Sequence, residues 1–502
     1  MRAASSAASH PDVLPVLACV LAGLGLRLWL AGTNSGLTMD SPEYVRIAEA
    51  LAASGRCPDA YQNHGYSMFI ALAQHVLPGR ELPGRIVSLV AGLVLIAITY
   101  ALARRTLGRP WAVGAALLVA LHPTLAVYSG AIMSEATFLA LVYGAVLLLV
   151  RSETRAGTVA GTLLGAAFWV RPEAALVALV AGVVTFATGG VRGRRVALAL
   201  LLAATLVGGA YAGFLRWERG VWTPTPKFVS QVEGERAEFT VGLVPRPAPP
   251  ARDAFRRAGE HAGQVVRVWP WALLALSALG WSRRRALLLA PLAPLAVLPF
   301  VAEPADLRLV MVAIPALAVL AAAGGARVAA RLAAWGALSH SLVRVATPAT
   351  ASVLVLAVGA LGLTRSWAGW AGARATNFDD GPMTELRAAG AWLRANGLPG
   401  ALVMDRKSYV PFFAEMPHAQ LPDDDITTVI TWAQARNARY LIVEEYVAAT
   451  LRPQLQPLIA DRARREAETR LVPVYAVRGA PGTGVAIFAV LPAEAVVTAT
   501  PP

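Results

Sequence analysis

A succession of apolar segments, separated by short arginine-rich turns, limits what this chain can fold into. A membrane-crossing helix needs about 20 consecutive apolar residues. With 56% hydrophobic and 15% charged residues and a mean hydropathy of +0.54, the composition is typical of a polytopic membrane protein. We therefore predict about eleven transmembrane helices. They occupy residues 13–31, 86–103, 111–129, 133–150, 157–170, 173–188, 196–216, 265–281, 286–301, 309–326 and 345–364.

Arginines in alternate turns predict the orientation of these spans. Cytoplasmic loops carry an excess of Lys and Arg, so the turns that contain the arginine clusters are expected inside. The N-terminus is then cytoplasmic, and the uncleaved first helix is followed by outer loops at 32–85, 217–264 and 302–308. Residues 327–344 are expected to form an amphipathic helix on the inner surface. The inner clusters are Arg104, Arg105 and Arg109; Arg151 and Arg155; Arg192, Arg194 and Arg195; Arg283, Arg284 and Arg285; and Arg327 and Arg331.

The C-terminal part of the chain differs in character from the rest. Amphipathic helical patterns at 383–396 and 426–437 alternate with short apolar strands at 401–404 and 439–443. We predict a transmembrane domain at 1–365 and a small extracytoplasmic α/β domain with its tail at 366–502.

Charge and cysteine usage exclude other classes. The formal net charge is +14, but the basic residues form no patch interleaved with aromatics, so nucleic acid is not an expected partner. Cys19 and Cys57 fall in a predicted span and in the loop after it, which argues against a structural disulfide and against a metal-thiolate site.

Ionisable residues that the predicted topology brings to the outer face are costly there unless they are solvated or paired, so they are candidate site residues. If the substrate is a sugar on a polyprenyl phosphate, the leaving group is already an anion and needs no general acid. Arginines are suited to hold it, because a guanidinium binds phosphate oxygens through two donors and stays charged. One carboxylate then suffices as base for an inverting displacement, and Asp40 fits that role. Glu43, three residues on, shares a helical face with it.

Plainer interpretations of the same residues stay open. Asp40 followed by Ser41, Pro42 and Glu43 is also a good helix start. Glu135 can oppose a helix dipole, and each arginine can extend to lipid headgroups. His64 and His122 could join Asp40 or Glu135 at a metal, although they lack ligand spacing.

These residues resemble the GT-C superfamily of membrane glycosyltransferases, specifically the bacterial branch similar to aminoarabinose transferases and protein O-mannosyltransferases. The resemblance runs along nearly the whole chain. Its marks are Asp40 with Tyr44; Gly65, Tyr66 and Phe69; Arg85 with Ser88; Pro123, Ser129, Ser134 and Glu135; Arg171, Pro172 and Glu173; and Arg308 with Pro315.

The resemblance implies transfer of a sugar from a polyprenyl-phosphate donor to a glycan, lipid or protein acceptor, at the outer face of a bacterial cytoplasmic membrane. It implies Asp40 as catalytic base and phosphate contacts from Arg85, Arg171 and Arg308. The predicted outer face adds Glu43 and Glu135 as further catalytic candidates, and other pocket candidates at Tyr44, His64, Tyr66, His122 and Glu173. No cofactor or bound metal is predicted, while assistance by a divalent cation stays open.

Two departures from the family pattern affect acceptor or sugar handling. Asp40 is followed by Ser41 where the protein mannosyltransferases carry an Asp-Glu pair, and Asn63-His64 replaces the usual double proline before Gly-Tyr.

Two other classes of protein remain as alternatives. One is a lipid or sugar transporter or flippase, and the other is a catalytically silent scaffold on the same fold. The absence of an internal repeat, and the gathering of charges at one predicted face, favour the enzyme over the transporter.

Overall fold

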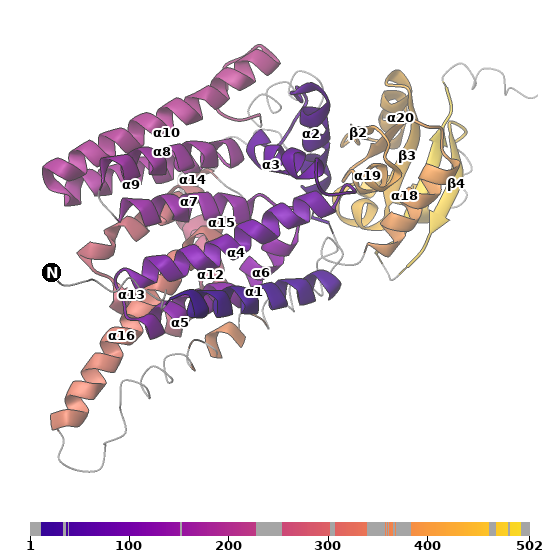
Figure 1. Ribbon diagram of the computed structural model, residues 1–502. Coiled ribbons are helices and arrows are strands. Elements are labelled where there is room, and N and C mark those ends of the chain that lie inside the picture. The colour runs from indigo at the N-terminus through magenta and orange to yellow at the C-terminus, as the bar shows by residue number, and fades with distance from the viewer. Residues whose placement is uncertain are drawn as a thin grey trace, which may run out of the picture. The chain divides into compact units, whose positions relative to one another are not determined.

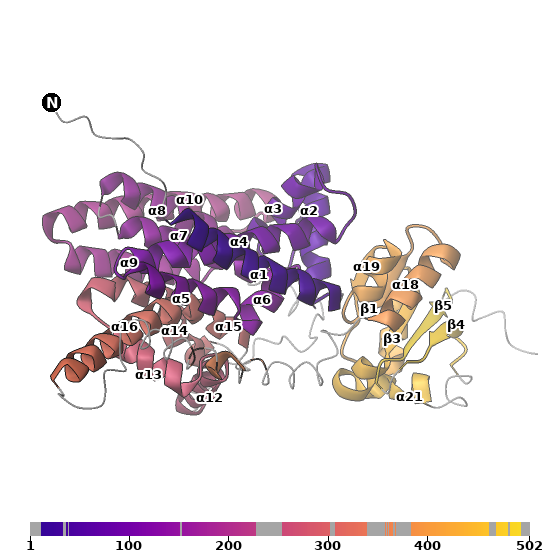
Figure 2. The same cartoon turned by 60° about the horizontal axis from the view of Figure 1, so that its bottom comes forward.

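The computed structural model describes residues 12–33, 37–38, 40–150, 153–226, 254–301, 307–338, 357, 359, 361–364, 367, 383–460, 468–479 and 482–492. The chain divides into two compact units. One is a helical bundle, and the other contains a five-stranded sheet together with the segment Asn34–Arg46, which includes the start of helix α2 (Ser41–Ser54) (Figures 1 and 2).

The helical bundle combines long apolar helices with shorter and broken ones. In the part of the chain that is described, four helices are long and apolar enough to cross a membrane, and two bent pairs raise that number to six. The four are Val13–Gly32, Leu82–Arg104, Gly190–Arg219 and Met311–Arg331. The helices of this part are α1 (Val13–Thr33), α2 (Ser41–Ser54), α3 (His64–Gln74), α4 (Leu82–Arg104), α5 (Arg109–Ala120), α6 (Pro123–Gly130), α7 (Glu135–Leu149), α8 (Thr154–Val170), α9 (Ala174–Thr188), α10 (Gly190–Arg219), α12 (Ala254–Val268), α13 (Trp271–Gly280), η2 (Arg283–Leu292), α14 (Ala293–Val301), α15 (Leu307–Val310), η3 (Met311–Ala313) and α16 (Ile314–Leu338).

Two predicted spans are broken rather than straight. The span expected at 111–129 consists of α5 and α6, which meet at 57° beside Pro123. The span expected at 265–281 consists of α12 and α13, which meet at 95° beside Pro270. Proline has no N–H to donate and fixes its own φ, so a helix tends to start at such a residue rather than run through it.

A third difference concerns the predicted surface helix at 327–344. Helix α16 runs without a break from Ile314 to Leu338, so the expected separate helix is its continuation. The alanine-rich sequence favours this continuity, since alanine has the highest helix propensity. The span predicted at 345–364 falls mostly outside the described residues.

Glycines bring α8 and α10 into close contact. A Cβ at Gly161 would lie 2.2 Å from the carbonyl oxygen of Leu200, and one at Gly157 would lie 2.6 Å from that of Val196. Gly165 continues the same four-residue repeat against Val207. Small residues at such spacing let the backbones of membrane helices pack directly. The two helices run alongside each other over their length in Figure 1.

Arg27 is a buried charge within α1. Only 1% of its surface is exposed, and its guanidinium donates to Ser129 Oγ (2.6 Å), Ala120 O (2.9 Å) and Gly23 O (3.0 Å). Ala120 is the last residue of α5, whose final carbonyls lack helical partners. Arg27 therefore supplies a hydrogen-bond donor to a carbonyl that the break between α5 and α6 leaves without a helical partner.

The two ends of α4 carry different polar groups. Near its start, Ser88 Oγ lies 2.6 Å from the Tyr66 hydroxyl. At its end, Arg104 pairs with Asp12, which also lies 3.3 Å from Arg109. Sixteen residues of helix between Ser88 and Arg104 correspond to about 24 Å, so these groups mark opposite ends of the bundle.

The second unit is built on a mixed sheet of order β2-β1-β3-β5-β4. Strand β1 (Leu402–Asp405) is parallel to β2 (His418–Gln420) and to β3 (Ala438–Glu444). β5 (Val485–Val490) is antiparallel to β3 and to β4 (Leu471–Val477). The helical elements are α18 (Thr384–Asn396), α19 (Tyr409–Ala414), α20 (Ile426–Ala435), η5 (Val447–Leu451), η6 (Pro453–Leu455) and α21 (Gln456–Ala460).

The two inner parallel strands both end in a buried carboxyl group. Asp405 closes β1 and Glu444 closes β3, and each is only 1% exposed. Burial raises the pKa of Asp405 to about 6. Hydrogen bonds from the amides of Arg406, Lys407 and Val410, and from Glu444, act in the opposite direction and lower it.

We predict that Gly161→Ala destabilises the bundle, because the added Cβ meets the Leu200 carbonyl. The matched control is Gly213→Ala on α10, where a Cβ would meet no atom within 4 Å. Thermal unfolding in detergent should show a melting temperature lowered by roughly 5 °C for the first variant and unchanged for the second. Equal melting temperatures would contradict the close packing.

We also predict a pH-dependent effect of Asp405→Asn. Because the folded-state pKa of Asp405 is raised above its ordinary value, its favourable contribution is complete below about pH 4 and is lost as the pH rises through about 6. The variant should therefore gain stability relative to the natural protein as the pH rises from 4 to 7, by roughly 3 °C in melting temperature. A difference that does not vary with pH would count against the raised pKa.

Candidate active site

The site lies at the end of the bundle where α3, α4, α7 and α8 meet. A Cβ at Gly65 of α3 would lie 2.5 Å from the backbone of Trp169, so only glycine permits this approach to the end of α8. The next residue, Tyr66, donates its hydroxyl to Gly84 O (3.0 Å), and Ser88 Oγ donates to Met133 O (3.0 Å). These contacts fix the loop that leads into α7.

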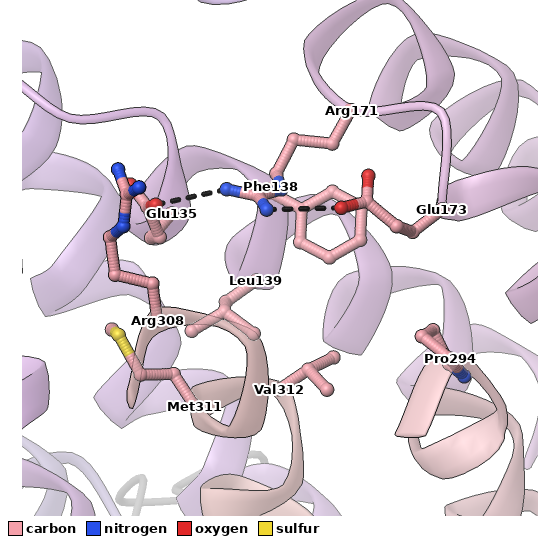
Figure 3. Close-up of a pocket in the computed structure, with 9 residues that line it drawn as sticks. All are labelled: Glu135, Phe138, Leu139, Arg171, Glu173, Pro294, Arg308, Met311 and Val312. Carbon is pink, nitrogen blue, oxygen red and sulfur yellow. Dashed lines mark hydrogen bonds and ion pairs between the residues drawn. The ribbon is translucent and has the colours of Figure 1, made fainter. Parts of the chain in front are cut away.

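A pocket at this end collects two acidic and two basic side chains. Arg171 Nη1 donates to Glu135 Oε1 (2.9 Å), and its Nη2 donates to Glu173 Oε1 (3.0 Å). Figure 3 shows Arg171 between these carboxylates and Arg308 extending toward the Glu135 side. The remaining lining residues are Phe138, Leu139, Pro294, Met311 and Val312. The open volume is about 20 Å³, room for about one water, so a larger ligand requires the side chains to move apart.

Glu135 is the most deeply buried ionisable group of this pocket, with 3% of its surface exposed. It begins α7, where the positive end of the helix dipole favours a carboxylate. Its Oε1 is bound by Arg171, whereas no hydrogen-bond donor within the described ranges reaches Oε2. Arg171 also lies over the Phe138 ring, at 5.8 Å from its centroid.

An apolar groove starts at the same turn between α8 and α9. Phe168 and Ala174, which flank Arg171 and Glu173 in sequence, line it, and so do residues of α10 from Leu201 to Ala212. Its volume is about 560 Å³. The α10 residues that line it span about 16 Å of helix, so the groove follows the helix axis. Trp222, Thr223 and Pro224 also line it.

Of the residues predicted for the site, Glu135, Arg171, Glu173 and Arg308 line this one pocket. Arg85 lies elsewhere: it pairs with Glu81 (3.2 Å) and donates to Gly130 O (3.3 Å). Tyr66 contacts Ser88, as described above.

The two histidines do not meet. His64 Nδ1 lies 3.0 Å from the Tyr211 hydroxyl and its Nε2 lies 3.2 Å from Glu218 Oε2, in a fully buried cluster. His122 Nε2 lies 2.8 Å from Val268 O, and its ring stacks on Trp269. Within the described ranges, no group of three His, Cys, Asp or Glu side chains is arranged to hold a metal ion.

Asp40, Glu43 and Tyr44 belong to the segment that clusters with the sheet unit. Asp40 is half-buried, and its carbonyl accepts the N–H of Tyr44 (3.1 Å) at the start of α2. Glu43 makes a two-point ion pair with Arg46 (2.8 and 2.9 Å), and Tyr44 is buried.

The sequence did not single out several residues that shape the site. Phe138, Met311 and Val312 line the pocket, and Glu218 and Tyr211 hold His64. Apolar residues give no sequence signal for a binding site, so their position in the pocket is known only from the packed helices. Glu218 carried a signal, since it is an acid at the end of an apolar helix.

Comparison with known proteins gives two kinds of match. Residues 65–213 match the family model described as dolichyl-phosphate-mannose-protein mannosyltransferase. Among solved structures, ArnT from Cupriavidus metallidurans bound to undecaprenyl phosphate matches with a TM-score of 0.58 at 14% identity, over 96% of this chain and 98% of that one. No curated protein matches the sequence.

An archaeal enzyme has the same fold. The apo oligosaccharyltransferase of Archaeoglobus fulgidus matches with a TM-score of 0.62 at 12% identity, over 98% of this chain and 76% of that one. The same archaeal protein, AglB, in complex with an inhibitory peptide and a dolichol-phosphate, matches with a TM-score of 0.57 at 13% identity, over 94% of this chain and 74% of that one. At such identities these likenesses establish the fold.

We predict that Arg171→Met lowers stability, because it leaves the buried Glu135 carboxylate without its ion-pair partner. The expected loss is about 1–3 kcal/mol. Adding Glu135→Gln to Arg171→Met should restore part of it, since the uncompensated charge is then removed. Thermal unfolding of the two single variants and the double variant measures this coupling, and strictly additive losses would contradict it.

Proposed function

Because the chain has the fold of the GT-C membrane glycosyltransferases and is similar to their ArnT and protein mannosyltransferase branch, we propose that it transfers a sugar from a polyprenyl phosphate to an acceptor. The acceptor is a glycan, lipid or protein of the cell envelope. The transfer is a single displacement that inverts the anomeric configuration.

The observation that carries this proposal is the joint placement of the charged pocket and the apolar groove. Arg171 and Arg308 line the pocket, and Phe168 and Ala174, on either side of the same turn, line the groove. A polyprenyl phosphate has this division: an anionic headgroup joined to a long apolar chain. We assign the headgroup to the pocket and the prenyl chain to the groove.

The charges of the pocket fit an anionic leaving group. Arg171 is held between Glu135 and Glu173, so its charge is largely balanced before a ligand arrives. Entry of a phosphate would draw the guanidinium forks of Arg171 and Arg308 to its oxygens, with the two-point geometry that arginine favours. The same two cations would then stabilise the charge that develops on the departing phosphate.

Asp40 is our proposed base for the acceptor hydroxyl. It is half-buried at the start of α2, so it can meet a substrate while remaining ordered by the helix. Glu43 is paired with Arg46 and is better suited to orient this turn than to accept a proton. Glu135 is the second carboxylate that the proposal retains, because its Oε2 can face a ligand in the pocket.

We assign residues 366–502 to an outer domain that supports the acceptor side of the reaction. Within the sheet unit, the Leu37 amide donates to the Met383 sulfur at 3.5 Å, so the segment leading to Asp40 is fastened beside α18. The domain would thus hold the base.

The pairing of Asp12 with Arg104 and Arg109 supports the proposed orientation. These groups lie at the end of α4 opposite to Tyr66 and Ser88. With the arginine-rich end in the cytoplasm, the pocket faces outward. We accordingly place the protein in a bacterial cytoplasmic membrane, with a cytoplasmic N-terminus and the α/β domain outside.

We predict that Asp40→Asn strongly slows transfer but leaves donor binding intact, whereas Arg308→Gln weakens donor binding. The measurement is turnover of radiolabelled polyprenyl-phosphate sugars by purified protein in lipid, with an envelope extract as acceptor. Loss of a general base should lower kcat by a factor of about 10² to 10⁴. Loss of one charged phosphate contact should raise the dissociation constant of the donor about tenfold.

Matched controls separate these effects from folding. Asp424→Asn changes an exposed acid of the sheet unit, and Arg331→Gln changes an exposed arginine of α16. Both controls should turn over like the natural protein. If the natural protein binds donor but never transfers its sugar, and moves the lipid across the membrane instead, the transporter alternative replaces the enzyme.

A further inference from the structure

At the carboxyl ends of the parallel strands in the sheet unit, several loops and their charged side chains lie close together. From β1 the chain passes through α19 to β2 on one side, and from β2 it passes through α20 to β3 on the other side of β1. The connection after β3 then leads away toward β4 and β5. Connections that diverge from neighbouring strands leave a crevice at their carboxyl ends, where open α/β sheets bind ligands.

Three loops bring charged side chains to this edge. Arg406 follows β1, Asp423 follows β2, and Arg452 follows β3 after the short helix η5. Arg452 Nη1 pairs with Asp423 Oδ2 at 3.2 Å, and Gln454 donates to Asp423 Oδ1 at 3.0 Å. Gln420, at the end of β2, donates to the carbonyl of Arg406 (3.1 Å), which ties the first two loops together.

Arg452 is buried but incompletely bonded. Only 4% of its surface is exposed, and no acceptor in the described part of the sheet unit reaches its buried Nε or Nη2. The half-buried Arg406 has a buried Nε in the same condition. Burial lowers the pKa of Arg452. The carboxylate of Asp423 raises this pKa, and the positive charge of Arg406 lowers it. Arg406 thus disfavours the charge on Arg452, and the loops that carry the two residues are joined through Gln420 and Asp423.

A buried donor without an acceptor is destabilising, and a nearby like charge adds to that cost. Neither cost is needed for packing alone, because an apolar side chain of similar size would avoid both. An oxyanion between the two arginines would accept their orphaned N–H groups and remove the repulsion.

We propose that Arg406 and Arg452 form an oxyanion-binding site in the α/β unit, separate from the Arg171 and Arg308 pocket, for a ligand that carries a phosphate or a carboxylate.

The test uses the full chain in a non-ionic detergent, in the Arg308→Gln background so that the other pocket contributes little. Inorganic phosphate and acetate, at constant ionic strength, are titrated by thermal shift and by calorimetry. We expect one of the two to raise the melting temperature with a saturating dose dependence. Stabilisation by phosphate alone identifies a phosphate ligand, and stabilisation by acetate alone identifies a carboxylate.

The variants are Arg406→Gln and Arg452→Lys, which keeps the charge but loses the fork, with the exposed Arg439→Gln of β3 as matched control. The first two should weaken anion binding about tenfold, and the control should not. Should Arg452→Lys fail to fold, Arg406→Gln decides alone, since its side chain is only half-buried. No anion-dependent stabilisation, or an equal loss in the control, would overturn the proposal.

Anion binding and sugar transfer can fail independently. Asp40→Asn should bind the anion normally while losing transfer. Normal transfer chemistry with no anion effect would reject this site and leave the proposed function standing. Anion binding in a protein that never transfers a sugar would do the reverse.

Discussion

The close packing of α8 against α10 is the contact on which the rest of the bundle end depends. Gly157, Gly161 and Gly165 let the two backbones touch, which leaves no freedom in where α8 ends. Its last turn carries Trp169, against which Gly65 of α3 packs, and Arg171 follows directly. The position of an arginine in the pocket is thus set by three residues that have no side chain.

The pocket built on this contact is nearly neutral in the absence of a ligand. Arg171 pairs with both Glu135 and Glu173, so a weakly charged ligand gains little binding free energy by entering the pocket. A phosphate gains enough to compete with the carboxylates, because its oxygens match the guanidinium fork and carry more charge. An arrangement of this kind trades affinity for discrimination, and it would suit the lipid-phosphate site proposed above, which has to distinguish its ligand from abundant zwitterionic headgroups.

Much of the fold could be predicted from the sequence, because long apolar runs and the hydrophobic periodicity of helices and strands are local signals. The predicted span at 86–103 corresponds to Leu82–Arg104, and the helix predicted at 426–437 corresponds to Ile426–Ala435. The breaks at Pro123 and Pro270 were missed, since hydropathy averages across a bend and carries no information on direction. The amphipathic pattern after Arg327 resembles the start of a separate surface helix, and sequence pattern alone does not distinguish that from the continuation of α16.

The site was predictable only in part. Glu135, Arg171, Glu173 and Arg308 could be grouped because each follows or opens a span at one predicted face. His64 and His122 lie at the same predicted face, yet each is enclosed by partners distant in sequence, Tyr211 and Trp269 among them. Which polar residues line a cavity and which are enclosed depends on helix rotation, and a hydropathy pattern fixes that only where one side of the helix is clearly polar.

The buried guanidinium of Arg27 bears on how such a chain is made. A charged residue inside a helix costs about 3 kcal/mol to place in the bilayer when the helix is alone. Its acceptors, Ala120 and Ser129, are synthesised about a hundred residues later. The insertion of the first helix alone is therefore less favourable than that of a fully apolar helix. The charge of Arg27 is compensated only when α5 and α6 pack against α1. Early insertion and later folding are coupled through one side chain, so a chain that stops before residue 120 would hold an α1 that still lacks both of these bonds.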